Sequence, residues 1–401
     1  MKKVFFLILL LMLPIWVNAL VYPSLHYKSA VIYDITDEKI LYELKSNEKR
    51  SIASLTKIVT TITALESIDD LNKEVLITNE MLSMVRWDAS VAGLKVGQKY
   101  TYEDLLYSSI LPSGADATVA IAISTSGSID NFVKKMNDLT DKIGMKDSNF
   151  VNVHGLDEKG HYSTADDIKK LLLYCFKNTK FKEIYTTKEY QLSTGKIVKS
   201  TVKTAGTRIG KDTSRILGSK TGFTLEAGLC MSAIISSDDH DILIITLGAP
   251  PNTGNTYHLL DTLELIKFID ESYNIEILSK KDSLIKTIPV SFSKKESYDV
   301  KTTKDITKFL EIDYDKTLIN VEFDGVEKLS YKNKVNSKIG SIIYKYDGKV
   351  ISSEDVLLNF ELEPDYIKII MQYKFYILVS IFIILLLFLI KIKKRKKHKR
   401  K

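Results

Sequence analysis

Short stretches of alternating apolar and polar residues predict β-strands in the first two thirds of the chain. They form two pairs, each separated by a polar turn, with strands at 30–35 and 40–44 and at 229–236 and 241–247. Apolar residues recur at three- to four-residue spacing elsewhere, which predicts helices at 54–68, 102–110, 116–123 and 257–273. Helices around an antiparallel sheet predict an α+β domain that ends near residue 275.

From residue 280 to residue 362 the pattern changes. Short alternating segments follow one another between polar and glycine-containing turns, and no helical periodicity interrupts them. This stretch predicts a small all-β domain without an obvious catalytic cluster.

Two longer apolar runs lie near the ends of the chain. Lys2 and Lys3 precede the run 4–17, and Ala19 follows it, which predicts a secretory signal peptide over 1–19 rather than an uncleaved anchor. The run 375–390 has sixteen residues without a charge, roughly 24 Å of helix. Although this length is slightly less than the thickness of the bilayer core, flanking tyrosines can lie at one membrane interface and the flanking lysine can reach the other.

Charge indicates the topology of the chain. The protein has 401 residues, 57 basic and 50 acidic, and a net charge of +7. Eleven basic residues lie at the ends, two in 1–19 and nine in 391–401, which leaves 46 against 50 acidic residues, a net charge of −4. A mildly acidic body argues against nucleic acid as a partner.

A basic tail that stays in the cytoplasm predicts a single-pass protein of the cell membrane whose residues 20–370 are extracytoplasmic. The alternative for 375–390 is a buried helix of a soluble protein, but a buried helix would not need the basic tail 391–401.

Ser54 and Lys57 form an S-x-x-K motif at the start of a predicted apolar helix. Positions i and i+3 share a helix face, so the amine can reach the hydroxyl and activate it if the lysine pKa is lowered. The pattern alone is weak, because the sequence contains it six times. Only Ser54 opens an apolar helix and is followed by Ser113-Gly114-Ala115 and by Lys220-Thr221-Gly222.

These motifs together resemble a known family. The stretches 51–57, 154–157, 161–165 and 220–228 read SIASLTK, HGLD, HYSTA and KTGFTLEAG. They are similar to the D-alanyl-D-alanine carboxypeptidases, low-molecular-mass penicillin-binding proteins with S-x-x-K and K-T-G motifs. The resemblance covers roughly residues 25–275, and the β domain and C-terminal helix also match the layout of the family. It implies a β-lactamase/transpeptidase-like fold for the catalytic domain, 20–275.

The resemblance also implies roles for individual residues. Ser54 is expected to attack the penultimate D-alanine of a peptidoglycan stem peptide, Lys57 to take its proton, and Ser113 to relay a proton to the leaving D-alanine. Lys220 and Thr221 are expected to bind the terminal carboxylate, and Gly222 to let the substrate approach the strand. The backbone N–H groups of Ser54 and Phe223 are expected to form the oxyanion hole. β-Lactams are expected to acylate Ser54.

One position departs from the family pattern. The second motif of the family usually ends in asparagine, which contacts the lysine and the substrate amide, whereas this chain has Ala115. The loss is expected to cost about 1–3 kcal/mol, the value of a hydrogen bond. The carboxylate of Asp116, one residue further on, is expected to point elsewhere.

The remaining candidates favour structural roles. Cys175 and Cys230 are expected to be small buried residues, although sequence alone leaves a disulfide between them open. His154 and His161 are expected to shape a loop, and Trp87 to be a packing residue or a loop anchor rather than a platform for a ligand. Scattered histidines predict no metal site and no cofactor.

Three hypotheses remain open from the sequence. The first is a serine-type D-Ala-D-Ala carboxypeptidase acting through an acyl-enzyme on Ser54. The second is a β-lactamase, for which no deacylating glutamate can be assigned. The third is a non-catalytic wall-binding protein, weakened by Ala115.

Overall fold

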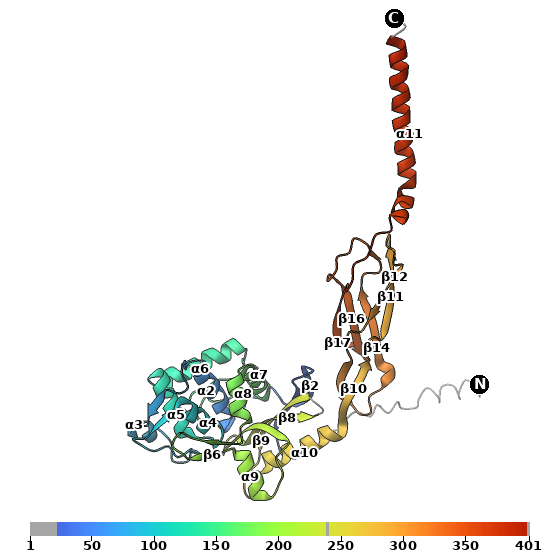
Figure 1. The fold of residues 1–401 in the computed structure, drawn as a ribbon. Helices are drawn as coiled ribbons and strands as arrows, with labels where there is room; N and C mark the ends of the chain where they lie inside the picture. Colours follow the sequence, from blue (N-terminus) through green and yellow to red (C-terminus); the bar gives the residue numbers. More distant parts are fainter. Residues whose placement is uncertain (1–21, 238–239, 399–401) are drawn as a thin grey trace, which may run out of the picture. The chain divides into compact units, whose positions relative to one another are not determined.

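The computed structural model describes residues 22–237 and 240–398, so the expected signal peptide lies outside the described residues (Figure 1). The chain divides into two compact units, one up to Asn274 and the other from Ile275 onward. Each unit has its own hydrophobic core.

A five-stranded antiparallel sheet in the order β2-β1-β9-β8-β7 forms the centre of the first unit. Its strands are β1 (Ser29–Asp34), β2 (Lys39–Leu44), β7 (Ile216–Thr224), β8 (Gly228–Ser237) and β9 (His240–Ala249). Successive residues of β8 and β9 are buried, although they point to opposite faces, so both faces of the sheet are covered. Both predicted hairpins are confirmed.

Helices make up most of the remaining secondary structure of the first unit (Figure 1). They are α2 (Thr56–Leu65), α3 (Asn79–Ser83), α4 (Tyr102–Ile110), α5 (Ala115–Ser126), α6 (Ile129–Ile143), α7 (Ala165–Cys175), α8 (Thr179–Thr186), α9 (Thr201–Ile209) and α10 (Tyr257–Ser272), with the 3₁₀ turn η1 (Ala53–Leu55) before α2. Two small antiparallel pairs complete the unit: β3 (Glu74–Leu76) pairs with β4 (Lys99–Thr101), and β5 (Glu189–Gln191) forms a hairpin with β6 (Ile197–Lys199).

Helix α2 is the central helix of this unit. All its residues except the last are buried, and it packs against α4, α5 and α6. An apolar helix buried on every side is held rigidly, which suits an element that carries reactive groups. The helix predicted at 54–68 is therefore present but shorter, and Ser54 lies in the preceding 3₁₀ turn.

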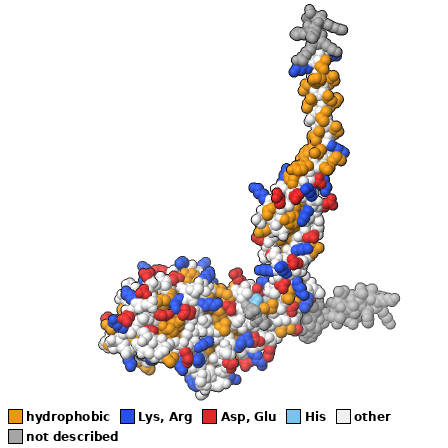
Figure 2. Space-filling view, viewed as in Figure 1, with side chains coloured by type: hydrophobic (Ala, Val, Ile, Leu, Met, Phe, Trp, Pro, Cys, Tyr) orange, Lys and Arg blue, Asp and Glu red, His pale blue; other side chains and the backbone are white. Residues whose placement is uncertain are grey.

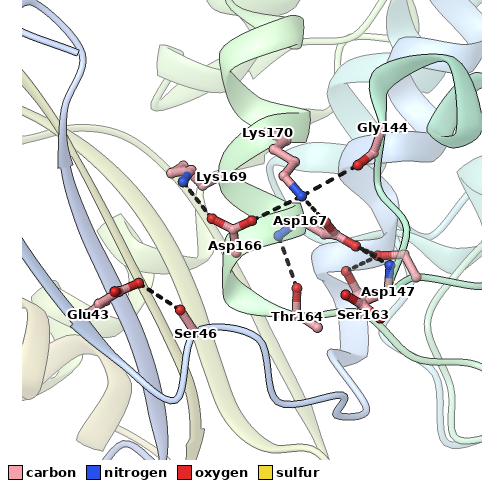
Figure 3. Close-up of polar contacts among 11 residues, drawn as sticks. Glu43, Ser46, Gly144, Asp147, Ser163, Thr164, Asp166, Asp167, Lys169 and Lys170 are labelled. Carbon is pink, nitrogen blue, oxygen red and sulfur yellow. Dashed lines mark hydrogen bonds and ion pairs between the residues drawn. The ribbon is translucent and has the colours of Figure 1, made fainter. Parts of the chain in front are cut away.

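The N-terminus of α7 is fixed by a network of carboxylates (Figure 3). Thr164 caps the helix by accepting from Asp167 N at 3.0 Å. Asp167 accepts from Ser148 Oγ and Asp147 N, and Asp166 pairs with Lys169 and Lys170. Negative charge at a helix N-terminus is stabilising, so this network joins the preceding loop to α7 and has a structural role.

The second unit contains three small sheets. They pair β10 (Tyr273–Ser279) with β13 (Ile306–Glu311), β11 (Leu284–Ser291) with β12 (Ser297–Lys301) and β15 (Leu329–Ser330), and β16 (Lys338–Tyr346) with β14 (Ile319–Gly325) and β17 (Lys349–Leu357). A short 3₁₀ turn, η2 (Lys316–Leu318), precedes β14. The core of the second unit contains completely buried side chains, among them those of Ile288, Val300, Ile342 and Tyr344.

Helix α11 (Tyr366–His398) follows the β-sheets of the second unit. Its segment Tyr366–Lys393, 28 residues long, contains a window with a mean hydropathy of 2.9, and no residue of this window is buried. In Figure 2 apolar side chains cover most of its visible face. At about 1.5 Å per residue the segment reaches about 42 Å, longer than the ~30 Å bilayer core. It is a candidate membrane-spanning helix that extends beyond 375–390 at both ends.

Both cysteines are buried free thiols, Cys175 at the end of α7 and Cys230 in β8. Burial raises the pKa of each thiol, that of Cys230 to about 12. They behave as small apolar residues.

Candidate active site

Ser54 and Lys57 lie next to each other at the start of α2. Lys57 Nζ donates hydrogen bonds to Ser54 Oγ at 2.9 Å and to the backbone oxygen of His154 at 2.7 Å. The lysine side chain is almost fully buried, 2% exposed. The 3₁₀ turn and the first turn of α2 thus bring together the hydroxyl and the amine.

Burial changes the protonation of this lysine. It lowers the pKa of Lys57 from 10.5 to about 7, while the negative charge of Asp116 opposes the shift. Burial, and then the charge of Lys57, hold the pKa of Lys220 well below its usual range. The sequence argument required a lowered pKa for Lys57, and loss of hydration is what lowers it in the structure.

Ser113 and Lys220 form a second serine–lysine pair. Lys220 Nζ donates to Ser113 Oγ at 2.8 Å and to the backbone oxygen of Thr221 at 2.7 Å. Lys220 is fully buried in β7, and Ser113 has a φ of +64° in the turn before α5. Two elements far apart in sequence therefore hold this pair.

Strand β7 passes close to the 3₁₀ turn of Ser54. A Cβ at Gly222 would lie 2.7 Å from Ser54 N and 2.9 Å from Ala53 Cβ. Gly222 is therefore required by the contact between the strand and this turn, in addition to the substrate approach expected from sequence. Phe223, the next residue, is 38% exposed.

These residues border an open cavity of about 630 Å³. Its lining includes Ser54, Ser113, Thr221, Gly222 and Phe223, while Lys57 and Lys220 lie buried behind it. The structure thus brings all seven predicted site residues to one place. The volume is large enough for a small peptide.

Sequence reasoning missed several residues that also line the cavity, among them Asp88, Ser90, Arg208, Asn255 and His258. Arg208, on α9, donates to the backbone oxygen of Gly254 at 2.6 Å. His258 lies in the first turn of α10, where burial and the charges of Lys220 and Arg208 lower its pKa to about 4. No local motif marks these residues, because they reach the cavity from separate parts of the chain, the loop 86–94, α9 and the segment that enters α10.

Asp116 points away from the missing asparagine position, as expected. Its carboxylate accepts from the backbone N–H groups of Ala92, Gly93 and Leu94 at 2.7–2.9 Å. It thereby fixes the loop that follows Asp88 and Ser90 at the cavity. Ala115 itself is fully buried.

The expectation that Trp87 packs was wrong. The loop 86–94 exposes 95% of its side chain, while its neighbours Arg86 and Asp88 form a two-point ion pair at 3.1 and 2.7 Å. This pair closes the loop around an outward-pointing tryptophan.

One group in the described part of the chain could present metal-binding atoms, Asp34, Asp37 and His240. Asp34 is already hydrogen-bonded to His240 at 2.8 Å and to the N–H groups of Thr36 and Asp37. None of the three lines the cavity, so the serine–lysine chemistry does not involve them.

The geometry agrees with comparisons to known proteins. The D-alanyl-D-alanine carboxypeptidase family matches residues 17–251. The D-alanyl-D-alanine carboxypeptidase DacF of Bacillus subtilis is 29% identical over 353 residues, 84% of this chain and 86% of that protein. DacD of Escherichia coli is 27% identical over 344 residues, 82% and 85% of the two chains.

Solved structures share the fold. Penicillin binding protein 5 from Haemophilus influenzae superposes with a TM-score of 0.65 at 22% identity, over 86% of this chain and 100% of that one. A peptidoglycan synthesis regulatory factor (PBP3) from Streptococcus pneumoniae gives a TM-score of 0.69 at 19% identity, over 85% and 100%. At these identities the likeness establishes the fold, and it confirms the predicted transpeptidase-like α+β architecture.

Proposed function

The chain belongs to the D-alanyl-D-alanine carboxypeptidase family, and we propose that it removes the terminal D-alanine from peptidoglycan stem pentapeptides through an acyl-enzyme on Ser54. The observation that carries this proposal is the 2.9 Å contact between Ser54 Oγ and Lys57 Nζ at the wall of the cavity. A serine needs an adjacent base to become a nucleophile, and a lysine with a pKa of about 7 is a base at neutral pH.

In this reaction Lys57 takes the proton of Ser54 as the serine oxygen attacks the carbonyl carbon of the penultimate D-alanine. The N–H groups of Ser54 and Phe223 stabilise the resulting oxyanion. Ser113, hydrogen-bonded to Lys220, passes a proton to the amine of the leaving D-alanine. Water then cleaves the ester, which releases the shortened peptide and restores the serine.

The terminal carboxylate of the substrate requires positive charge. We assign its recognition to Lys220 and to the hydroxyl of Thr221, a neutral hydrogen-bond donor, with the guanidinium of Arg208 as a cation that lines the cavity. A β-lactam carries a carboxylate beside its reactive carbonyl, so it is expected to occupy the same cavity and acylate Ser54.

The proposed topology places this reaction outside the cell membrane. The signal peptide 1–19 directs export, α11 crosses the bilayer, and the basic tail 391–401 stays in the cytoplasm. The net charge of the remaining chain, −4, is compatible with an extracytoplasmic body.

The experiment that tests the proposal uses the full-length protein in detergent. It is incubated with a pentapeptide ending in D-Ala-D-Ala and, separately, with penicillin. Released D-alanine and a penicilloyl adduct on Ser54 by mass spectrometry are expected, and Ser54→Ala should abolish both. Absence of both from the wild-type protein would refute the proposal.

The two other hypotheses give different results in the same experiment. A β-lactamase hydrolyses nitrocefin rapidly and accumulates no adduct. A non-catalytic wall-binding protein binds the peptide without turnover, even after Ala115→Asn. The family membership supports the carboxypeptidase over both, and the complete serine–lysine pair supports it over the non-catalytic protein.

A further inference from the structure

The residue before the proposed nucleophile has an unfavourable backbone conformation. Ala53 has a φ of +48°, in the left-handed region that non-glycine residues rarely adopt. It is fully buried in the 3₁₀ turn that carries Ser54. Such a conformation persists only where its surroundings hold it, and here it sets the direction of the Ser54 N–H and side chain.

The carbonyl group of Ala53 is held by a chain of hydrogen bonds. Thr56 Oγ1 lies 2.9 Å from Ala53 O and donates to it. The same hydroxyl oxygen lies 2.7 Å from Nε2 of His161, a residue 105 positions further along the chain. The opposite ring nitrogen, Nδ1, accepts from the backbone N–H of Val151 at 3.2 Å.

The direction of this chain follows from its ends. A backbone N–H can only donate, so Nδ1 of His161 is the acceptor and Nε2 carries the hydrogen of the neutral ring. Nε2–H then donates to Thr56 Oγ1, whose own hydrogen is free to donate to Ala53 O. Each donor has one acceptor, and the chain runs in one direction from Val151 to the turn of Ser54.

The imidazole stays neutral in the range where the enzyme is expected to work. His161 is 5% exposed, and burial lowers its pKa to about 4, with the charge of Lys57 acting in the same direction and Asp157 opposing it. The ring of Phe150 packs against it in a T-shaped contact at a centroid distance of 5.5 Å. A neutral, covered ring keeps one tautomer and therefore one direction of hydrogen bonding.

The loop that carries His161 also encloses the Ala53 carbonyl. A Cβ at Gly155 would lie 1.9 Å from Ala53 O and 2.7 Å from Thr56 Oγ1. The same loop supplies the His154 oxygen that accepts from Lys57. A single loop therefore contacts the base and the turn of the nucleophile.

We propose that His161 is a positioning residue that acts through Thr56 on the carbonyl of Ala53 and thereby holds Ser54 and its N–H in the geometry for acylation. The proposal rests on the function proposed above. His161 touches neither substrate nor reacting atoms, and it differs from a general base in that its effect does not depend on its titration.

Two pairs of variants of the full-length protein test this. Thr56→Val removes the hydroxyl at nearly constant volume, and Thr56→Ser keeps it. His161→Leu removes both ring nitrogens, and His161→Gln retains an acceptor and a donor on one edge. The acylation rate constant and the initial binding constant for a fluorescent penicillin are measured separately, with thermal unfolding as the folding control.

We expect the acylation rate to fall about 10- to 100-fold in Thr56→Val and His161→Leu, because small displacements of reacting groups have effects of this size. The binding constant should change less than about threefold, and Thr56→Ser and His161→Gln should recover most of the rate. The pH at half-maximal rate should remain that of the wild type. Unchanged acylation in folded Thr56→Val would overturn the proposal, as would a shift of the pH profile in His161→Gln.

Hydrogen–deuterium exchange gives a readout that does not depend on activity. The peptide covering 51–57 should exchange faster in Thr56→Val and His161→Leu than in the wild type and the two conservative variants. If the wild-type protein is not acylated, the proposed function fails, and this comparison still decides the inference. Equal exchange in all five proteins would refute it.

Discussion

The buried Lys57 makes acylation of Ser54 depend on pH near neutrality. Burial lowers the pKa of Lys57 from 10.5 to about 7. This difference corresponds to about 5 kcal/mol at 1.36 kcal/mol per unit. At pH 7 about half of the molecules hold a neutral amine, whereas a lysine with the ordinary pKa would be neutral in about one molecule in 3,000.

The direction of the pH dependence follows from the role of the neutral form of Lys57. Only the neutral amine can take the proton of Ser54, so the acylation rate should rise with pH, by about tenfold per unit below pH 6 and level off above pH 8. Histidine side chains near the site do not produce this limb, because burial lowers the pKa of His154 to about 3 and those of His161 and His258 to about 4.

The assay measures the second-order rate constant for labelling by a fluorescent penicillin between pH 5.5 and 9, with full-length protein in detergent. Asp116→Asn should move the midpoint to lower pH, because the negative charge of Asp116 raises the pKa of Lys57. Asp130→Asn, at an exposed first-turn position of α6, is the matched control and should leave the midpoint of the pH profile unchanged. A midpoint near pH 10, or a rate independent of pH from 5.5 to 8.5, would refute the reasoning.

Three further predictions concern the strand, the second motif and the β domain. Gly222→Ala places a Cβ 2.7 Å from Ser54 N, so it should lower the acylation rate at least tenfold in a penicillin-labelling assay, and normal labelling would contradict the close contact. Ala115→Asn should shift the midpoint of the acylation profile to higher pH, and an unchanged or lower midpoint would count against the argument given below. Ile342→Ala, in the buried core of the second unit, should cost about 2–5 kcal/mol in the unfolding of that unit, measured by denaturant titration. It should leave labelling of Ser54 intact, since the two units have separate cores, and parallel loss of labelling would refute their independence.

Periodicity predicted some of the amphipathic helices but not others, such as α6 and α7. Helix α4 has the predicted bounds, and α10 differs by one residue at its end. The start of α2 could not be predicted, because the left-handed Ala53 converts the expected first turn into a separate 3₁₀ turn. That conformation depends on His161 and Gly155, about 100 residues away, and no local pattern carries this information.

The candidate site residues likewise could be predicted from sequence only where a local motif marks them. The order of the motifs was sufficient to choose Ser54 and Lys57 among six S-x-x-K matches and to single out Lys220 of the K-T-G motif, because a motif carries its own spacing. Arg208 and His258 reach the cavity only through the packing of α9 and α10. Trp87 was expected to have a packing role, but its side chain is 95% exposed, and its neighbours Arg86 and Asp88 pair with each other.

The replacement of the family asparagine by Ala115 affects the two charge states of Lys57 differently. An ammonium group has three hydrogens to donate, and the described contacts supply two acceptors, Ser54 Oγ and the oxygen of His154. A neutral amine needs fewer acceptors, since its lone pair can accept the hydrogen of the Ser54 hydroxyl. The resemblance to the family places the missing amide next to this lysine, where its oxygen would favour the ammonium form. Ala115 therefore favours the neutral amine that acylation requires, and its cost is to be sought in the binding of the substrate amide.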